Sequence, residues 1–261
     1  MNLTSQMVSV ATRAALEAGR RLKDRRGTAF RISKKDRINL VTEVDLEAER
    51  IVVERIRFHF PDHQILAEEG GLTGADASFR WIVDPLDGTT NYAHGYRFFC
   101  VSIGLEIDRE LQLGVVYDPV TEELFTAEKG QGARLNGQPI GVSPQDVLVD
   151  SLVATGFSYD REQMQRNLDL FGRVMLKVQA IRRDGAAALD LCYVACGRFD
   201  AFWELHLSPW DVAAGKLMVE EAGGRVTDLR GKSWQMRGGE VLASNGTLHP
   251  VLLELIEAGS V

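Results

Sequence analysis

Several features that define other protein classes are missing from this 261-residue sequence. It has no apolar run of the roughly 20 residues that span a membrane, and its first residues lack the basic-then-apolar order of a secretory signal. Its three cysteines suit a reducing compartment better than a disulfide framework, which needs an even number. We therefore expect a cytoplasmic globular protein with no membrane partner.

Positive charge is also scarce. The chain has 30 Lys and Arg residues against 37 Asp and Glu residues, for a net charge of −7 at pH 7. Nucleic-acid binding depends on clustered positive charge, so we expect no nucleic acid as the primary partner. The histidines are scattered, and Pro61 breaks the helical spacing of His59 and His63. Cys192 and Cys196 have no second Cys or His pair nearby, which favours buried structural thiols over zinc ligands.

Residues 1–145 are predicted to form an N-terminal α+β half. Apolar residues at helical spacing predict helices over residues 5–26 and 43–59, with Thr42 as an N-cap and Asp45 in the capping-box position. Short apolar runs predict strands over residues 65–67, 79–83, 98–107, 111–117 and 124–127. A tight hairpin turn is expected at Asn136 and Gly137.

Residues 146–261 are predicted to form a C-terminal α/β half, because strand and helix patterns alternate there. The expected strands cover residues 152–154, 179–182, 200–203 and 240–243, and the expected helices cover residues 161–177, 186–196, 210–222 and 248–258. No internal repeat occurs at a fixed spacing.

Acidic residues follow two predicted strands and open one predicted helix. Glu68 comes after the strand 65–67, Asp84 and Asp87 come after the strand 79–83, and Asp211 opens the later helix. Alone, each is typical of a cap or a solvated turn. Together, converging carboxylates would repel one another by several kcal/mol, which bound cations would have to offset. Oxygen ligands of this kind favour Mg²⁺.

The segment DPLDGTTN, residues 84–91, adds a site for phosphate. Gly88, Thr89 and Thr90 present consecutive backbone N–H groups where a turn or helix begins, an arrangement that binds anions. Metal ions beside a phosphate favour phosphate-ester hydrolysis, with one ion activating a water and a neighbour stabilising the leaving oxygen.

Two long motifs resemble the paired signature of the inositol monophosphatase family, the lithium-sensitive, magnesium-dependent phosphatases. They are DPLDGTTN and, at residues 210–224, WDVAAGKLMVEEAGG. The likeness extends over nearly the whole chain. It implies an α/β (α+β) fold, the layered αβαβα sandwich of the inositol monophosphatase / fructose-1,6-bisphosphatase type, assembled as a homodimer. It also implies a phosphoric monoester hydrolase that acts on inositol monophosphate or a related sugar phosphate.

The resemblance assigns metal ligands. Glu68, Asp84 and the carbonyl oxygen of Leu86 match the ligands of a first Mg²⁺ ion, and Asp84, Asp87 and Asp211 match those of a second. Glu68 with waters matches a weaker third position, so two or three ions per site are implied.

The resemblance also assigns catalytic and phosphate contacts. Thr89 and Glu68 match the residues that orient the attacking water, and Asp45 matches the acid that hydrogen-bonds the threonine. The amides of Gly88 and Thr89 match the phosphate contacts. Lys34 matches a basic residue near the site.

Asp87, Ala187 and Glu204 match positions that contact the substrate. Many relatives have Ser or Thr where this chain has Ala186, which leaves the preferred ring open. From the residues alone, Asp45 is equally consistent with a purely capping role, and Glu204 with a solvated strand edge.

Other functions stay open. The substrate could be fructose 1,6-bisphosphate, histidinol phosphate or a 3′-phosphonucleotide. Relatives with the last two tend to have Lys where this chain has Thr90, so Thr90 and Asn91 favour a sugar phosphate. A regulatory protein that associates with the transcription machinery is an alternative of another class, although such a role would not require the full carboxylate set.

Overall fold

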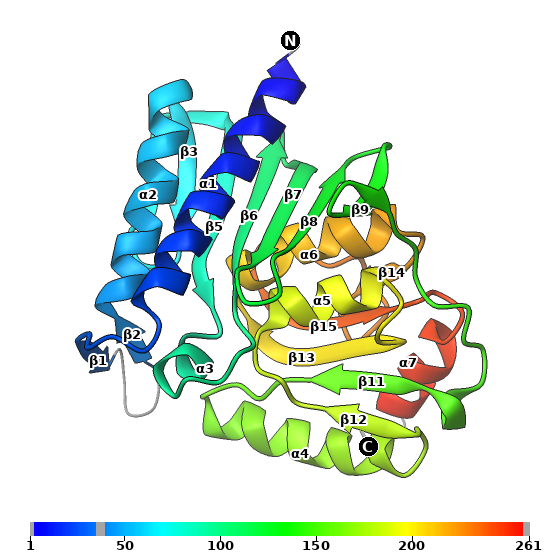
Figure 1. Cartoon of the computed structure of the whole chain (residues 1–261). Coiled ribbons are helices and arrows are strands. Elements are labelled where there is room, and N and C mark those ends of the chain that lie inside the picture. The colour runs from blue at the N-terminus through cyan, green and yellow to red at the C-terminus, as the bar shows by residue number, and fades with distance from the viewer. Residues whose placement is uncertain (1–2, 35–39, 258–261) are drawn as a thin grey trace.

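The computed structural model describes residues 3–34 and 40–257 as layers of helices and sheets that alternate from one side to the other (Figure 1). The helices are, layer by layer, α1 (Leu3–Arg25) and α2 (Glu43–His59), then α5 (Ala187–Ala195) and α6 (Pro209–Glu221), then α4 (Arg161–Met175) and α7 (His249–Glu257). One sheet lies in each gap between these layers. The expected αβαβα sandwich is therefore confirmed.

The first sheet has the strand order β10-β9-β8-β7-β6-β5-β3-β4. Its strands are β3 (His63–Ala67), β4 (Gly71–Thr73), β5 (Asp76–Asp87), β6 (Cys100–Ile107), β7 (Glu110–Asp118), β8 (Glu123–Glu128), β9 (Gly132–Leu135) and β10 (Gln138–Pro139). Neighbours pair antiparallel, apart from the parallel pair β3 and β5. The predicted hairpin turn is confirmed, since Asn136 and Gly137 have φ of 49° and 79°.

The second sheet has the order β12-β11-β13-β15-β14. Its strands are β11 (Leu152–Thr155), β12 (Ala180–Arg182), β13 (Ala201–Leu207), β14 (Arg225–Thr227) and β15 (Gly239–Ser244). β11 runs parallel to β12 and β13, while β15 is antiparallel to both its neighbours. Outside these sheets lie the pair β1 (Ile32–Lys34) and β2 (Leu40–Thr42), the short helix α3 (Thr89–Ala93) and a 3₁₀ turn, Leu148–Asp150.

The start of α2 is as predicted, because Thr42 is its N-cap and Asp45 completes the capping box. The strand predicted over residues 79–83 is too short, since β5 continues to Asp87. Its pairing with β6 shifts between Asp84 and Asp87. Pro85 lies in that interval and has no N–H for the ladder, which accounts for the irregularity. Asp84 therefore lies inside the strand instead of following it.

The middle layer is built from small and apolar residues. α6 buries Val212, Ala213 and Leu217 among other residues, so it is apolar on most of its surface, as a helix enclosed by two sheets must be. Cys192 of α5 and Cys100 at the start of β6 are fully buried in the core around this layer, and burial raises the pKa of each thiol well above its usual range, whereas Cys196 is only partly buried. These two cysteines are therefore packed as structural thiols. No helix within residues 3–34 and 40–257 is long and apolar enough to cross a membrane.

His249, at the start of α7, is a buried histidine that links two strands of the second sheet. Its Nε2 lies 2.9 Å from the hydroxyl of Thr227, and its Nδ1 lies 2.9 Å from the hydroxyl of Ser244. Thr227 donates its own proton to the carbonyl of Asp228, so it accepts from Nε2–H, and Ser244 donates to Nδ1. This arrangement requires a neutral ring. Burial, with a smaller effect of Arg225, lowers its pKa to about 4.

A depressed histidine pKa makes stability depend on pH. The contribution of neutral His249 is fully present above the unfolded pKa of about 6.5 and is lost as the pH falls toward 4. Between pH 7 and pH 5 we expect the free energy of unfolding to fall by roughly 2 kcal/mol more in the natural protein than in His249→Gln. Urea unfolding of both proteins measures this difference. The same pH slope for both would contradict the expectation.

Candidate active site

A cavity of about 660 Å³ opens where strands of both sheets end. Its lining residues follow β3, β11 and β12, form the ends of β5 and β13, or lie at the starts of α3, α5 and α6. The lining residues are Glu68, Asp84, Leu86, Asp87, Gly88, Thr89, Thr90, Gly156, Phe157, Ser158, Tyr159, Asp160, Arg183, Gly185, Ala187, Glu204, His206, Leu207, Ser208, Trp210 and Asp211. Ligands of α/β proteins bind at such strand ends.

The predicted acidic cluster comes together in this cavity. Asp84 and Asp87 are only 2% and 8% exposed. Backbone amides hold three of the four carboxylates: Asp84 accepts from the N–H of Leu86 at 3.0 Å, Asp87 from that of Ala188 at 2.7 Å, and Asp211 from that of Ser208 at 2.7 Å. Each acid is thus oriented by the backbone of a turn or helix start.

The electrostatics of the cluster are unfavourable without cations. Burial, followed by the charges of Glu68, Asp87 and Asp211, raises the pKa of Asp84 well above its usual range. Burial also raises the pKa of Asp87 to about 7 and that of Asp211 well above normal. Acids with raised pKa values take up protons at a higher pH than usual, and a bound cation would offset the same repulsion.

The donor set fits a hard divalent cation. Within the described residues, no group of three or more His, Cys, Asp or Glu side chains is arranged so that it could hold a metal ion by itself. Mg²⁺ does not need one, because it keeps several waters and binds through a few carboxylates together with substrate phosphate. Carboxyl groups whose ionised forms are disfavoured by burial and by neighbouring negative charge are suited to such an ion, which supplies the missing positive charge. The residues therefore fit the cofactor expected from the sequence.

Thr89 and Asp45 form a pair beside the acids. The hydroxyl of Thr89 lies 2.8 Å from Oδ1 of Asp45 and 3.0 Å from the carbonyl oxygen of Leu86. Asp45 is fully buried, and its Oδ2 is bound by Thr42 in the capping box. The two readings of Asp45 from sequence were thus not exclusive, since one carboxylate caps α2 and also binds Thr89.

Gly88 allows the chain to turn into α3. It has φ of 94°, and a Cβ there would lie 2.9 Å from the carbonyl oxygen of Phe98, so no other residue fits without rearrangement. Gly88 is the N-cap, and first-turn amides such as that of Thr89 have no partner within a helix. This predicted phosphate segment lines the cavity.

Two side chains of the same motif bind the second half of the chain. Asp87 accepts the first-turn amide of Ala188 in α5. Asn91 donates to the carbonyl oxygens of Phe98 at 2.8 Å and Asp184 at 2.7 Å. The segment 84–91 and the start of α5 therefore hold each other in position.

Glu204 also lines the cavity, directly over Gly156. A Cβ at position 156 would lie 2.0 Å from Oε2 of Glu204, so glycine makes room for this carboxylate. Burial, then the charges of Asp211 and Asp87, raises the pKa of Glu204 to about 8. Ala187 opens α5 beside it, and the N-cap Ala186 offers no side-chain hydrogen bond. Glu204 is thus a cavity residue and not a solvated strand edge.

Sequence reasoning missed several residues that line the cavity. Tyr159 binds the hydroxyl of Thr90 at 2.7 Å, and Arg183 places the positive charge that acts on Glu204. His206 lies in an irregular part of β13 with φ of 64°, an unusual conformation for a residue with a side chain. Arg183 directly follows β12, so its place at a predicted strand end could have indicated it. Tyr159 and His206 are brought to the cavity only by tertiary contacts. The side chain of Lys34 lies outside the described parts.

Comparisons with known proteins agree with this geometry. The model of the inositol monophosphatase family matches residues 3–260. The chain is 45% identical to an inositol-1-monophosphatase of Synechocystis, over 96% of this chain and 88% of the relative. It is 42% identical to Nus factor SuhB of Pseudomonas aeruginosa, over 96% of each. The inositol monophosphatase structure from Anabaena superposes with a TM-score of 0.89 at 44% identity, over 97% of this chain and 96% of the other.

Repulsion within the acidic cluster should be measurable without any reaction. Asp84→Asn keeps the oxygen that accepts the Leu86 amide and removes one buried charge. With chelator present, we expect the unfolding temperature to rise by roughly 2–6 °C. Added Mg²⁺ should then stabilise the variant less than the natural protein. Differential scanning calorimetry tests both, with the exposed Asp146→Asn as a control. A lower unfolding temperature in chelator would contradict the repulsion.

Proposed function

The chain belongs to the inositol monophosphatase family and is a phosphoric monoester hydrolase of the inositol-1-monophosphatase type, and from this we propose how its cavity acts. The substrate is inositol monophosphate or a related sugar phosphate, and the cofactor is Mg²⁺, with two or three ions per site. One observation carries the proposal: Glu68, Asp84, Asp87 and Asp211 line the same cavity as Thr89.

Metal-dependence is general in this family, and the carboxylates here suit Mg²⁺. Glu68, Asp84 and the carbonyl oxygen of Leu86 would hold a first ion, and Asp84, Asp87 and Asp211 a second. Glu68 with waters would hold a weaker third. Bound ions would neutralise the acids and the phosphate, lower the pKa of an attacking water and stabilise the leaving oxygen. The raised pKa values of Asp84 and Asp211 support this assignment, because burial and then the charges of neighbouring acids disfavour their ionised forms, which bound cations would favour.

The protein's own groups would orient the reactants. The amides of Gly88 and Thr89 bind the phosphate at the start of α3. Asp45 accepts a hydrogen bond from the hydroxyl of Thr89 at 2.8 Å. The oxygen lone pairs of Thr89 are then left to accept a hydrogen bond from the attacking water. Glu68 binds the same water from the other side. The water is thereby directed at phosphorus before the reaction begins.

The ring of the substrate would contact Asp87, Ala187 and Glu204. The carboxylate of Glu204 accepts hydrogen bonds from ring hydroxyls, which donate. Its pKa of about 8 reflects burial and then the charges of Asp211 and Asp87, so cations bound by those acids would favour its ionised form. Ala186 provides no hydroxyl, so a ring bound here relies on Glu204 for its polar contacts on that side.

We further propose that the protein is a cytoplasmic homodimer. Within each chain, the N-terminal half, residues 1–145, and the C-terminal half, residues 146–261, would both contribute to the site. The exposed apolar side chains of Leu168, Met175 and Leu176 support a subunit interface, since burying them would stabilise the assembly. The relative named Nus factor SuhB favours a second, regulatory role beside hydrolysis, in association with the transcription machinery.

A phosphate-release screen tests the function. With Mg²⁺, we expect hydrolysis of inositol 1-phosphate above that of fructose 1,6-bisphosphate, histidinol phosphate and adenosine 3′,5′-bisphosphate. Chelation should abolish it, because the bare acids repel a phosphate dianion, and millimolar lithium should inhibit it. Full turnover after exhaustive chelation would contradict the metal assignment. No release from any of these esters would contradict the proposed activity.

Replacing Glu204 separates ring recognition from phosphate chemistry. Glu204→Gln keeps the size of the side chain and weakens charge-assisted hydrogen bonds worth about 1.5–3 kcal/mol each. We expect KM for inositol 1-phosphate to rise roughly ten- to a hundredfold, with hydrolysis of a small aryl phosphate nearly unchanged. Glu254→Gln, an exposed change on α7, is the matched control. An equal loss on both substrates would mean that Glu204 supports the metal ligands or the fold.

A further inference from the structure

Thr42 binds Asp45 in a way that directs its carboxylate. The backbone N–H of Thr42 donates to Oδ2 of Asp45 at 2.8 Å, and its hydroxyl donates to the same oxygen at 2.5 Å. Thr42 is 1% exposed and Asp45 is 0% exposed, so water does not compete for these bonds. Oδ2 is thus engaged twice, and Oδ1 is left to accept the hydroxyl of Thr89.

The same hydroxyl caps α2, which fixes the direction of its proton. Oγ1 of Thr42 accepts the N–H of Val44 at 3.1 Å and that of Asp45 at 3.4 Å. A hydroxyl has one proton and two lone pairs. With both lone pairs facing the helix amides, the proton points to Oδ2 of Asp45. The start of the helix therefore orients the carboxylate.

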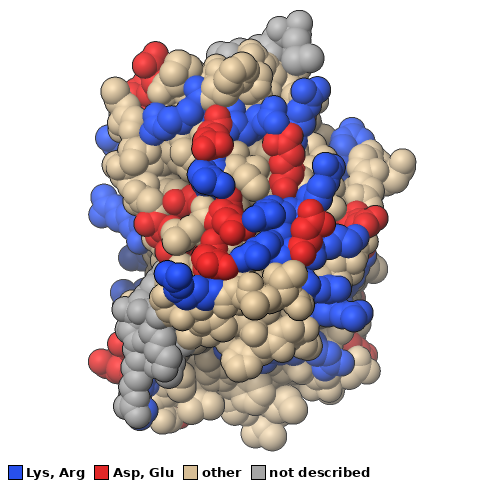
Figure 2. Space-filling model, turned by 60° about the vertical axis from the view of Figure 1, so that its left-hand side comes forward, with Lys and Arg blue, Asp and Glu red and all other residues tan. Residues whose placement is uncertain are grey.

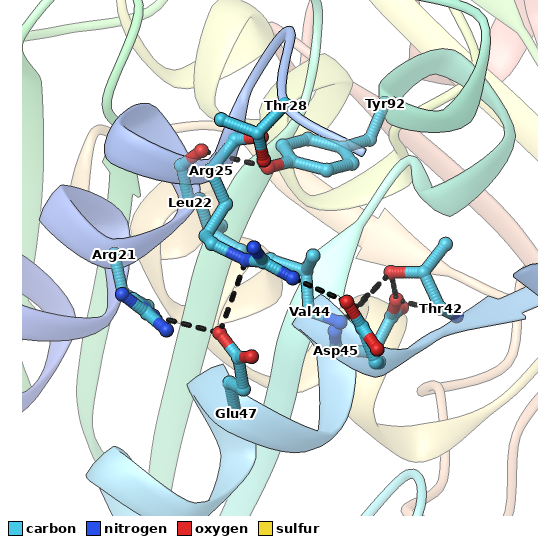
Figure 3. Close-up of polar contacts among 10 residues, drawn as sticks. Arg21, Leu22, Arg25, Thr28, Thr42, Val44, Asp45, Glu47 and Tyr92 are labelled. Carbon is cyan, nitrogen blue, oxygen red and sulfur yellow. Dashed lines mark hydrogen bonds and ion pairs between the residues drawn. The ribbon is translucent and has the colours of Figure 1, made fainter. Parts of the chain in front are cut away.

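Contacts between α1, α2 and α3 hold this helix start in place (Figure 3). Arg25 pairs with Glu43 and Glu47, and Arg21 pairs with Glu47 at 2.7 Å. Tyr92 of α3 donates its hydroxyl to a carbonyl of α1 at 2.8 Å. Figure 2, in which the side of the molecule that carries α1 and α2 is turned forward, shows acidic and basic side chains interspersed there. The helix that carries Asp45 and the helix that begins at Thr89 are thus joined through the end of α1.

We infer that Thr42 is a positioning residue for hydrolysis, which acts through Asp45 on Thr89; the inference rests on the proposed role of Thr89 in orienting water. The hydroxyl of Thr89 has two acceptors in reach, Oδ1 of Asp45 at 2.8 Å and the carbonyl of Leu86 at 3.0 Å. While Thr42 holds Asp45, the proton goes to the carboxylate. Without the hydroxyl, only the backbone N–H of residue 42 holds Oδ2, so the carboxylate turns more easily and the proton of Thr89 shifts toward Leu86.

Thr42→Val removes the hydroxyl at nearly constant volume, and Thr42→Ser keeps it. We expect the valine variant to lose about tenfold in kcat with little change in KM, and the serine variant to regain it. Magnesium affinity, measured by calorimetry, should be unchanged in both. Equal losses in the two variants, or losses in kcat and magnesium affinity together, would overturn the inference.

Thr227→Val is the matched control, because Thr227 is 3% exposed and its hydroxyl makes one buried and one partly buried hydrogen bond in the second sheet. It should lower the unfolding temperature without lowering kcat. If it slows turnover as much as Thr42→Val does, general destabilisation explains both. Should Thr42→Val not fold, Thr42→Gly removes the same hydroxyl and leaves an N-cap residue that helices accept at little cost. It should reproduce the kcat loss, and normal turnover would overturn the inference.

Two further measurements isolate the route through Asp45. In an Asp45→Asn background, Thr42→Val should add little further loss of kcat, because the two residues act as one unit. Full additivity would overturn the route. A crystal structure of Thr42→Val should also show the Asp45 carboxylate turned away from Thr89, and an unchanged carboxylate would count against positioning. This last result does not depend on activity, so it tests the orientation of Asp45 by Thr42 separately from the phosphate-release screen.

Discussion

Buried like charge is the constraint on which the cavity depends. Asp84, Asp87 and Asp211 are brought together in a region with little water, where burial first, and then the charges of neighbouring acids, raises the pKa of each carboxyl group. The fold offsets part of this by giving each acid a backbone amide at a turn or a helix start. Helix starts serve this purpose because their first amides have no partner within the helix and carry partial positive charge. The electrostatic strain that remains has the same origin as the cation binding proposed for these acids, because both come from buried like charge.

The same bonds also join the two parts of the chain. Asp87 comes from the first sheet and accepts the amide of Ala188 in α5, and Asn91 reaches the carbonyl of Asp184. Glu204, from the second sheet, faces the acids of the first across the space that Gly156 leaves. The site is therefore complete only when both sheets are folded and packed on the middle helices. A change in how the two sheets pack should therefore change the shape of the cavity, because the residues that line it come from both sheets.

Sequence patterns predicted the long elements, because periodicity, caps and turns are local properties. The capping box at Thr42 and the hairpin turn at Asn136 are examples, each determined by residues within a few positions. The end of β5 was misjudged because Pro85 disrupts a strand that pairing with β6 nevertheless continues. Tyr159 and His206 could not be assigned to the cavity, since only tertiary contacts bring them there. The acidic residues could be predicted to lie together because they belong to or neighbour two long motifs, and all four line the cavity.

Asp45 illustrates why local structure and chemistry should not be treated as competing explanations. A capping residue is usually regarded as structural, and a residue that binds a catalytic hydroxyl as functional. Here the cap bonds occupy Oδ2 and thereby leave Oδ1 facing Thr89, so the structural role produces the functional orientation. A helix start is a suitable place for such a residue, because its geometry is set by backbone bonds and not by a mobile side chain. The orientation of the Asp45 carboxylate toward Thr89 is therefore determined by the start of α2.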